Sequence, residues 1–315
     1  MSTKTPVDKW KPIGRGKLAL GDCRELLRTL DECSIDCVIA DPPYNYEFVG
    51  REWNYEEIKR RLKKVALKDS KTLVKNIPYG SGLSGGERNA RWYKKNQNNA
   101  IDYQAWVNSW AVETFRVCKP GAYVAVFNAT RFLARVQVAL EDAGFYPRDV
   151  LVFKKNSGIP RGLNAVGQLK KRGHPDPESW TGYHSALRNE WEGVVLVQRP
   201  LDTNYLTTAA QYGTGLMRVE RDGRFLSNIF EKIQVIPKRE PTKDGDHPTE
   251  KPIEWITHLL ELLIPPAGDP VVLDPFLGSG TTAVAAELLG IRWLGIDLVP
   301  EYLSIAKDRI SKVNS

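Results

Sequence analysis

Short apolar runs rich in β-branched residues alternate with helical patterns along most of the 315-residue chain, and this alternation strongly constrains its fold. Such an order is typical of a mostly parallel sheet with helices on both faces. We therefore predict an α/β core with seven strands. The predicted strands are Gly16–Gly21, Ile35–Ala40, Ala122–Asn128, Asp149–Lys154, Gly193–Arg199, Val271–Asp274 and Arg292–Asp297.

Two helices can be predicted from apolar periodicity. Apolar residues from Tyr103 to Cys118 recur every three to four positions and end at Lys119-Pro120-Gly121, which is a helix stop signal. The stretch Ile253–Leu263 repeats the pattern and is closed by Pro265-Pro266. Both helices fit between predicted strands.

Three stretches interrupt this rhythm. Residues 46–99 are polar and basic and contain a Gly/Ser-rich run, so we expect a loop there. Residues 156–191 and 201–246 are rich in Gly, Pro, Asn and Arg and lie outside the sheet pattern. These stretches predict insertions at one edge of the α/β core.

The net charge of +7 is unevenly distributed. Residues 51–99 carry a net charge of +8 and residues 154–172 carry +6, which leaves −7 for the rest of the chain. Two basic segments on a slightly acidic body favour the binding of a polyanion on one surface. Solvated helix faces and loops are the alternative for either segment taken alone.

Several classes of protein are disfavoured. The apolar runs are too short to span a bilayer, and the N-terminus shows neither a signal nor a transit peptide, so we expect a cytoplasmic protein without membrane contact. Four cysteines, without a CxxC pair or matched histidines, predict reduced and mostly buried thiols. We expect no metal site.

The first motif with chemical content is VVLDPFLGSGTT at residues 271–282, a strand followed by a glycine turn and a helix. Gly278 and Gly280 allow a ligand to approach the backbone, and the helix N-terminus offers free N–H groups. Asp297 ends the next strand 19 residues after Gly278, where an acidic residue meets a ribose in related nucleotide sites. The pattern predicts half of an adenosine pocket, although many structural corners share it. The missing third glycine of GxGxxG disfavours a dinucleotide dehydrogenase.

The second motif is IDCVIADPPYN at residues 35–45, again a strand that ends in polar and aromatic residues. Ligands in open α/β sheets bind beyond the carboxyl ends of strands, so Asp41 and Tyr44 should lie at the same rim as the glycine turn. Pro42 and Pro43 fix the backbone and leave carbonyls without ladder partners. A carboxylate, a free carbonyl and an aromatic face suit a planar base with an amino group. The alternative is a rigid turn with a solvent-facing Asp.

With these motifs the chain resembles the amino-methylating DNA methyltransferases that use S-adenosylmethionine. Asp41–Tyr44 is similar to their catalytic motif and Asp274–Thr282 to their methionine-binding motif. His247–Pro252 resembles the segment that precedes the cofactor helix and strand in the β subgroup, and the motif order is that of this subgroup. The resemblance covers the framework from about Gly16 to Lys312. It implies a Rossmann-like fold with circularly permuted motifs and inserted target-recognition loops.

The resemblance also implies roles for individual residues. The target base would be flipped out of the duplex and stacked on Tyr44, while the Asp41 carboxylate and the Pro42 carbonyl accept its amino hydrogens; Pro43 completes the motif. The implied residues for S-adenosylmethionine, which becomes S-adenosylhomocysteine, are Asp22, Cys23, Asp41, Thr249, Lys251, Asp274, Phe276, Gly278, Ser279, Gly280, Thr281, Thr282 and Asp297.

Three of these assignments are more detailed. Asp22 would lie near the adenine ring, and Asp297 would take the ribose hydroxyls, although this family more often has Glu at that position. Thr249 and Lys251 would border the methionine carboxylate. In the alternative, His247 and Lys251 cap the following helix.

The choice of target base rests on the first residue of the catalytic motif. Relatives with Asp followed by Pro-Pro-Tyr-Asn are mostly adenine-N6 enzymes, whereas cytosine-N4 enzymes of this order more often carry Ser. We therefore predict adenine-N6, with cytosine-N4 as the alternative. Cytosine-C5 chemistry is excluded because the chain has no Pro-Cys pair to supply the nucleophile.

Other rivals and the domain organisation complete the prediction. RNA, a protein glutamine or a catalytically silent DNA-binding role are weaker alternatives, because the basic insertions, the motif order and the intact motifs disfavour them. Residues 1–155 would form the catalytic half with the basic loop 46–99, residues 156–246 the target-recognition insertions around the core strand 193–199, and residues 247–315 the cofactor half. The partners would be double-stranded DNA, a second copy of the chain in a homodimer and a cognate restriction endonuclease.

Overall fold

The computed structural model describes residues 9–44, 90–155, 162–231, 251–266 and 268–313. One large sheet of nine strands dominates this part of the chain, in the order β1-β2-β11-β10-β3-β4-β6-β5-β9. Its strands are β1 (Trp10–Ile13), β2 (Gly16–Leu20), β3 (Ile35–Ala40), β4 (Cys118–Asn128), β5 (Tyr146–Lys154), β6 (Trp191–Gln198), β9 (Ile229–Phe230), β10 (Val271–Asp274) and β11 (Arg292–Asp297).

All seven predicted strands are present, and they form the middle of the sheet. Neighbouring strands from β2 through β11, β10 and β3 to β4 are parallel, whereas β6 runs antiparallel to both β4 and β5. The short edge strands β1 and β9 are additions to the predicted set. β9 lies within 201–246, so the expectation that this whole stretch falls outside the sheet is wrong at residues 229–230.

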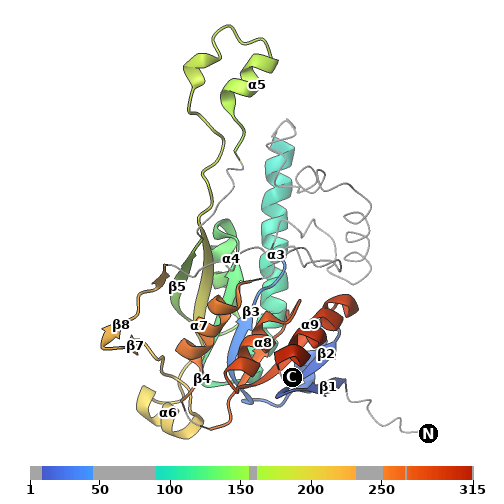
Figure 1. Ribbon diagram of the computed structural model, residues 1–315, viewed down its shortest axis with the longest axis vertical. Helices are drawn as coiled ribbons and strands as arrows, with labels where there is room; N and C mark the ends of the chain where they lie inside the picture. Colours follow the sequence, from blue (N-terminus) through green and yellow to red (C-terminus); the bar gives the residue numbers. More distant parts are fainter. Residues whose placement is uncertain (1–8, 45–89, 156–161, 232–250, 267, 314–315) are drawn as a thin grey trace, which may run out of the picture.

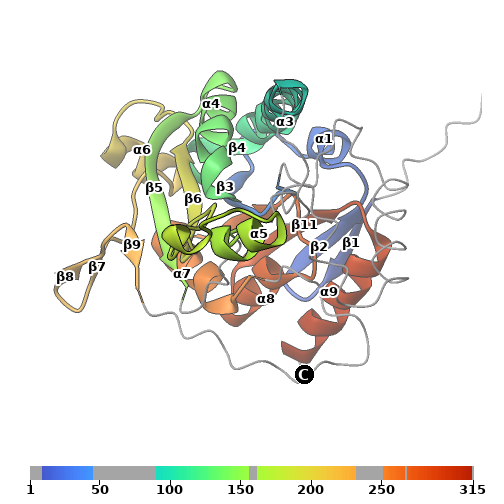
Figure 2. The same cartoon turned by 90° about the horizontal axis from the view of Figure 1, so that it is seen from above.

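Helices cover both faces of the sheet (Figures 1 and 2). One face carries α1 (Cys23–Leu26), α3 (Ala90–Val117) and α4 (Leu133–Asp142), and the other carries α7 (Ile253–Leu263), α8 (Thr281–Leu288) and α9 (Pro300–Val313). Two short 3-10 turns lie next to these helices, namely η1 (Leu27–Thr29) and η4 (Thr130–Phe132). A third, η5 (Glu178–Trp180), belongs to the arm described below.

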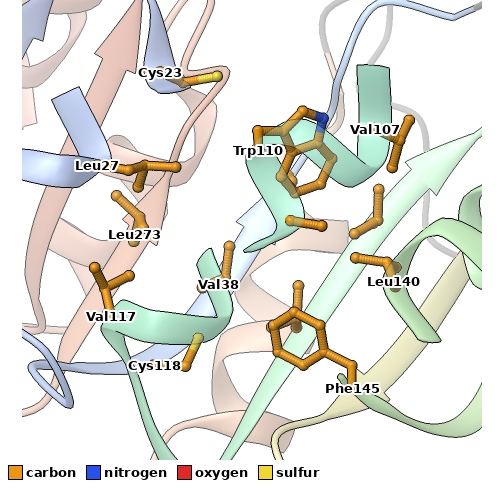
Figure 3. Packing of buried hydrophobic residues seen from close by; sticks show 14 of the residues in the cluster. Cys23, Leu27, Val38, Val107, Trp110, Val117, Cys118, Leu140, Phe145 and Leu273 are labelled. Carbon is orange, nitrogen blue, oxygen red and sulfur yellow. The ribbon is translucent and has the colours of Figure 1, made fainter. Parts of the chain in front are cut away.

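The hydrophobic core has two halves, one on each face of the sheet. Val38 and Ala40 of β3 face the cluster that holds α3 and α4, while Cys37 and Ile39 face the cluster of α7, α8 and α9. Figure 3 shows part of the first cluster, in which Trp110 of α3 is one of the largest buried side chains. Because β3 is buried on both faces, its sequence is apolar at every position except Asp36, which pairs with Lys119, rather than alternating.

Helix α3 is longer than its apolar pattern predicts. It begins at Ala90 instead of Tyr103, so residues 90–99 are helical and the predicted loop to Asn99 is wrong there. Lys94, Gln97 and Asn98 are exposed, which shows that this part extends beyond the core and needs no apolar stripe. The predicted helix end at Cys118 is off by one, since that residue already starts β4.

The insertions lie at opposite ends of the sheet. Residues 162–190, hereafter the arm, include α5 (Ala165–Lys171) and project beyond the carboxyl ends of the parallel strands (Figure 1). In contrast, α6 (Tyr205–Tyr212) lies at the amino end of β4, where the Tyr123 hydroxyl donates to the Gly215 carbonyl (3.1 Å). A small hairpin follows, formed by β7 (Glu220–Arg221) and β8 (Arg224–Phe225).

Candidate active site

The two predicted motifs meet at one rim of the sheet. β10 and β3 are parallel neighbours in the register Val272↔Cys37 and Leu273↔Val38, so Asp274 and Asp41 leave adjoining strands at the same end. β11 and β2 continue the parallel order and bring Asp297 and Asp22 to this rim. The prediction that the glycine turn and the Asp-Pro-Pro-Tyr motif share a rim is confirmed.

Asp274 builds the glycine turn from inside. Its carboxylate accepts from the Phe276 N–H (2.9 Å) and from the Thr282 hydroxyl (2.5 Å), so it ties the start of the turn to the first turn of α8. Burial raises the pKa of Asp274 to about 7, against the opposing effect of these two hydrogen bonds, and the nearby Asp41 and Asp297 add to the rise. Asp274 and Thr282 therefore shape the turn, and the direct contact with a cofactor that the resemblance implies for them stays a prediction.

Asp297 supports the same turn from the next strand. One of its oxygens accepts from the Gly278 N–H and the other from the Val299 N–H, both at 2.8 Å. Burial raises the pKa of Asp297 to about 6, although the N–H donors favour the ionised form. A carboxylate oxygen has a second acceptor direction, so a ribose hydroxyl can still be received.

Gly278 and Gly280 have φ values of 55° and 88°, in the left-handed region that favours glycine. A Cβ at Gly280 would lie 2.8 Å from the Ala306 Cβ, so a side chain there has no room against α9. Gly280 is also the N-cap of α8 and provides no side-chain hydrogen bond to the helix. The turn therefore leaves the N-terminus of α8 without a side-chain cap.

Three residues that support the turn, Trp106, Trp110 and Arg309, are not predicted from the sequence to do so. Phe276 packs against Trp106 and Trp110 of α3, at centroid distances of 5.6 and 5.2 Å. Arg309 of α9 donates from Nη1 to the backbone oxygen and the hydroxyl of Ser279, both at 2.8 Å. The tryptophans belong to a helix whose periodicity indicates only burial, and Arg309 is 30 residues away from Ser279, so no local signal marks these contacts.

Asp22 is the N-cap of α1 and accepts from the Arg24 N–H at 2.8 Å. The Arg24 guanidinium also pairs with it, with Nη2 2.6 Å from Oδ2, and despite the opposing effect of burial these contacts lower the pKa of Asp22. The neighbouring Cys23 is buried, and burial raises the pKa of its thiol. Cys37 and Cys118 are buried too, while Cys33 is exposed, as expected for mostly buried thiols.

Asp41 directly follows β3 and forms an ion pair with Lys251, whose Nζ lies 2.7 Å from Oδ2. The other oxygen, Oδ1, is shielded from solvent and has no hydrogen-bond partner in the part of the chain that the structure describes. Burial raises the pKa of Asp41, while the Lys251 ammonium favours the ionised form. Lys251 does not cap α7, because the N-cap of that helix is Pro252 and the Lys251 ammonium is directed at Asp41 and Glu192 instead.

A second carboxylate lies beside this pair and is absent from the predicted site. Glu192 of β6 accepts from the Tyr44 hydroxyl at 3.1 Å, and its Oε2 lies 3.5 Å from Lys251 Nζ. Lys155 pairs with Glu192 from the other side. The predicted strand begins at Gly193, one residue too late to include Glu192. The charge pattern assigns Lys155 to a basic surface for a polyanion, but here it neutralises a largely buried carboxylate.

Two predicted residues lie outside the described residues, namely His247 and Thr249. Ser279, Thr281 and Thr282 lie at or next to the start of α8 and are buried. Across the described ranges, no three His, Cys, Asp or Glu side chains gather closely enough to hold a metal ion. No helix in the described part of the chain combines the length and apolarity that crossing a bilayer requires.

The fold and the site define a class of protein. A mostly parallel sheet presents a glycine turn, an uncapped helix N-terminus and acidic strand ends at one rim, as in α/β enzymes that bind a nucleotide-like ligand. Residues 35–308 match the model of the N6/N4 methyltransferase family, described as DNA methylase, and the chain belongs to this family. The chain is thus a DNA methyltransferase that modifies an exocyclic amino group.

Two curated relatives match the chain along most of its length. It is 28% identical to the type II methyltransferase M.HindIII of Haemophilus influenzae over 294 residues, which cover 90% of this chain and 91% of that protein. It is 29% identical to the type II methyltransferase M.XycI of Xanthomonas campestris pv. cyanopsidis over 309 residues, covering 94% and 87% of the two chains.

Solved structures share the fold. The M1.HpyAVI–SAM complex has a TM-score of 0.52 at 16% identity and covers 94% of this chain and 99% of that one. TTHA0409 of Thermus thermophilus, complexed with S-adenosyl-L-methionine, gives 0.54 at 20% identity, with coverage of 94% and 93%. The cytosine-N4-specific PvuII DNA methyltransferase gives 0.54 at 16% identity, with coverage of 95% and 91%.

Proposed function

We propose that this protein is a site-specific DNA methyltransferase that transfers the methyl group of S-adenosylmethionine to N6 of adenine in duplex DNA. The observation that carries the proposal is how the two carboxylate oxygens of Asp41 are hydrogen-bonded. Its Oδ2 is held by Lys251, and its Oδ1 is a buried acceptor with no partner among the described residues. A buried acceptor without a partner is costly, and an amino group of a bound base would satisfy it.

The glycine turn fits S-adenosylmethionine. Residues 276–282 would surround its methionine part, with Asp297 at the ribose and Asp22 near the adenine, because these groups line the adjoining ends of β10, β11 and β2. Two of the structural relatives were solved with this cofactor. When bound, the cofactor supplies an electrophilic methyl group next to Asp41.

The residues of the chain itself orient the target base. Asp41 Oδ1 and the Pro42 carbonyl would accept the two amino hydrogens, and Tyr44 would stack on the flipped base. Holding the amine in this way aligns its lone pair for in-line transfer and supports the positive charge that develops on nitrogen. No enzyme nucleophile is required, so the buried thiols need not take part.

Adenine is favoured over cytosine by the Asp41-Pro42-Pro43-Tyr44 sequence, through its resemblance to adenine-N6 enzymes. The fold does not separate the two, because the cytosine-N4-specific PvuII enzyme shares it. Cytosine-N4 remains the second candidate. An exocyclic amine of either base would offer the same hydrogens to the same acceptors.

Duplex DNA would lie across the carboxyl rim, beneath the arm. We assign target recognition to the basic segment 154–172, except Lys155, and to the arm, and we expect residues 46–99 to act near the flipped base. Within the stretch 201–246, we leave α6 out of target recognition, because it lies at the amino end of β4, opposite the carboxyl ends at which the two motifs meet. A homodimer and a cognate restriction endonuclease remain proposals, the latter supported by two relatives named as type II methyltransferases.

The decisive experiment is methyl transfer from tritiated S-adenosylmethionine to PCR-amplified genomic DNA, which carries no methylation. The DNA is then digested to nucleosides and separated by chromatography. Label in N6-methyladenine is the expected result, and label in N4-methylcytosine would replace adenine by the second candidate. DNA binding without any transfer would refute the enzymatic proposal and favour a silent DNA-binding protein. The Asp41→Ala variant serves as the negative control for methyl transfer.

A further inference from the structure

Four charged side chains form a cluster on one face of the sheet, where β3, β4, β6 and β5 lie next to one another. Asp41 follows β3, Glu192 lies in β6, and Lys155 and Lys251 reach them from the end of β5 and the start of α7. The alternation of each strand places Asp41 and Glu192 on the face of α7, since Ile39 and Val194 both belong to the cluster on that face. Two positive and two negative charges balance each other in this cluster.

Glu192 is the junction of the cluster. Its Oε2 receives both the Tyr44 hydroxyl (3.1 Å) and the Lys251 ammonium (3.5 Å), while its Oε1 pairs with Lys155. The Glu192 side chain is only 18% exposed, so these contacts are little screened by water. One side chain thus connects the two residues that flank the site of the target base.

Lys251 is held on several sides. Its side chain is 9% exposed, and its ammonium lies 5.3 Å from the ring centres of both Tyr44 and Phe127. A buried ammonium needs compensation, which Asp41 and Glu192 provide together. If the Glu192 charge were removed, Asp41 would be the one carboxylate left beside Lys251 among the described residues.

We propose, on the basis of the function proposed above, that Glu192 is a positioning residue for methyl transfer. It anchors the Tyr44 hydroxyl and the Lys251 ammonium, and thereby keeps the Tyr44 ring and Asp41 Oδ1 in the geometry that a flipped base requires. Glu192 itself does not touch the base in this arrangement. A displacement of about 1 Å in such a site is enough to slow a reaction by about 100-fold.

The charges around Asp41 give this proposal a measurable signature. The groups that face it are Lys251, Tyr44, Glu192 and Asp274. Burial raises the pKa of Asp41, Lys251 lowers it, and the negative charge of Glu192 raises it. Replacing Glu192 by a neutral residue of the same shape should therefore lower the pKa of Asp41, whereas neutralising Lys251 should raise it.

The test compares Glu192→Gln with Glu141→Gln, at an exposed glutamate of α4 that accepts from the Gln137 side chain and lies outside the cluster and the arm. Single-turnover methyl transfer to PCR-amplified DNA should slow by about 10- to 100-fold in Glu192→Gln, while cofactor and DNA dissociation constants stay within about twofold. Glu141→Gln should behave as the wild type. Glu192→Ala, which also loses the acceptor for Tyr44, should be slower still.

A second measurement requires neither cofactor nor DNA. Titration of the ¹³C-labelled Asp41 carboxyl by NMR, assigned with Asp41→Asn, should show a lower pKa in Glu192→Gln and a higher one in Lys251→Met. Thermal unfolding confirms that each variant is folded. An unchanged Asp41 titration in Glu192→Gln, or a transfer rate within about twofold of the wild type, would overturn the proposal.

The two readouts also separate this inference from the proposed function. If the wild type transfers no methyl group to DNA, the function fails, and the Asp41 titration still shows whether Glu192 controls that carboxylate. If the wild type methylates DNA and a folded Glu192→Gln variant loses only cofactor binding, with the Asp41 titration unchanged, Glu192 is merely structural and the positioning role is refuted.

Discussion

At the scale of single residues, the site depends on how each carboxylate uses its two oxygens. Asp274 and Asp297 use theirs to accept backbone N–H groups and a hydroxyl, and so hold the glycine turn. Asp41 commits only one oxygen, to Lys251, and keeps the other unpaired with any described residue. Three acidic residues at one rim therefore have two different tasks, which their spacing in the sequence does not reveal.

Replacing Asp41 by Ala should reduce the methyl-transfer rate by at least about 100-fold, because the acceptor for the target amine is lost. The fold should survive, since Lys251 keeps Glu192 as a partner at 3.5 Å. Cofactor affinity, measured by calorimetry, should change by less than about twofold. Asp31→Ala, at an exposed position, is the matched control. Substantial turnover by Asp41→Ala would remove this residue from the mechanism.

The raised pKa of Asp274, about 7, makes a prediction about stability. Its carboxyl takes up protons more readily in the folded chain than in the unfolded chain, where the pKa is 3.8. The stabilisation of the fold by this protonated carboxyl is therefore fully present below about pH 4 and is lost as pH rises to about 7. The loss is about 4 kcal/mol at most.

The Asp274→Asn variant should lack this loss, because an amide does not ionise in this range. Urea unfolding at about pH 4.5 and about pH 7.5 measures the free energy of unfolding, and the variant should gain stability relative to the wild type at the higher pH. Asp308→Asn, on the exposed side of α9, should show no such gain. If the free energy of unfolding depends on pH equally in the wild type and in Asp274→Asn, the pKa of Asp274 is not raised in the folded chain.

At the scale of elements, the arm differs from the rest of the chain. Helix α5 has no buried residue, and the arm is held together mainly by its own backbone bonds, such as the one that the Ala165 N–H donates to the Tyr183 carbonyl (3.1 Å). A segment that buries so little apolar surface contributes little to folding stability. Its position beyond the carboxyl rim, together with Lys170, Lys171 and Arg172, favours contact with DNA phosphates.

Neutralising two of these charges should weaken DNA binding without affecting the fold. In a Lys171→Ala/Arg172→Ala variant we expect lower affinity for all duplexes, and a slope of log K against log salt that is less steep by roughly 1 to 2 units. Fluorescence anisotropy over a salt series measures both. The control is Lys11→Ala/Lys17→Ala in the edge hairpin of β1 and β2. An effect as large in the control would show only a general charge effect.

At the scale of the whole molecule, the strand order assembles the site from distant parts of the chain. Asp41 and Asp274 are 233 positions apart in the sequence, yet they leave neighbouring strands, because β10 inserts between β11 and β3. The same order puts α6 at the far end of the sheet and the arm above the rim. The sheet therefore separates a reactive end from a structural end.

The sequence alone determined the seven central strands, the helix Ile253–Leu263 and the two motifs, because these depend on local apolar patterns and on glycine and proline at turns. It did not reveal the helical residues 90–99, since a helix that extends beyond its core carries no apolar stripe. Only the tertiary structure decided that Glu192 and Lys155 belong with Asp41 and that Arg309 holds the glycine turn. These contacts join side chains far apart in the sequence, and charge pairing across strands follows from their packing rather than from any local pattern.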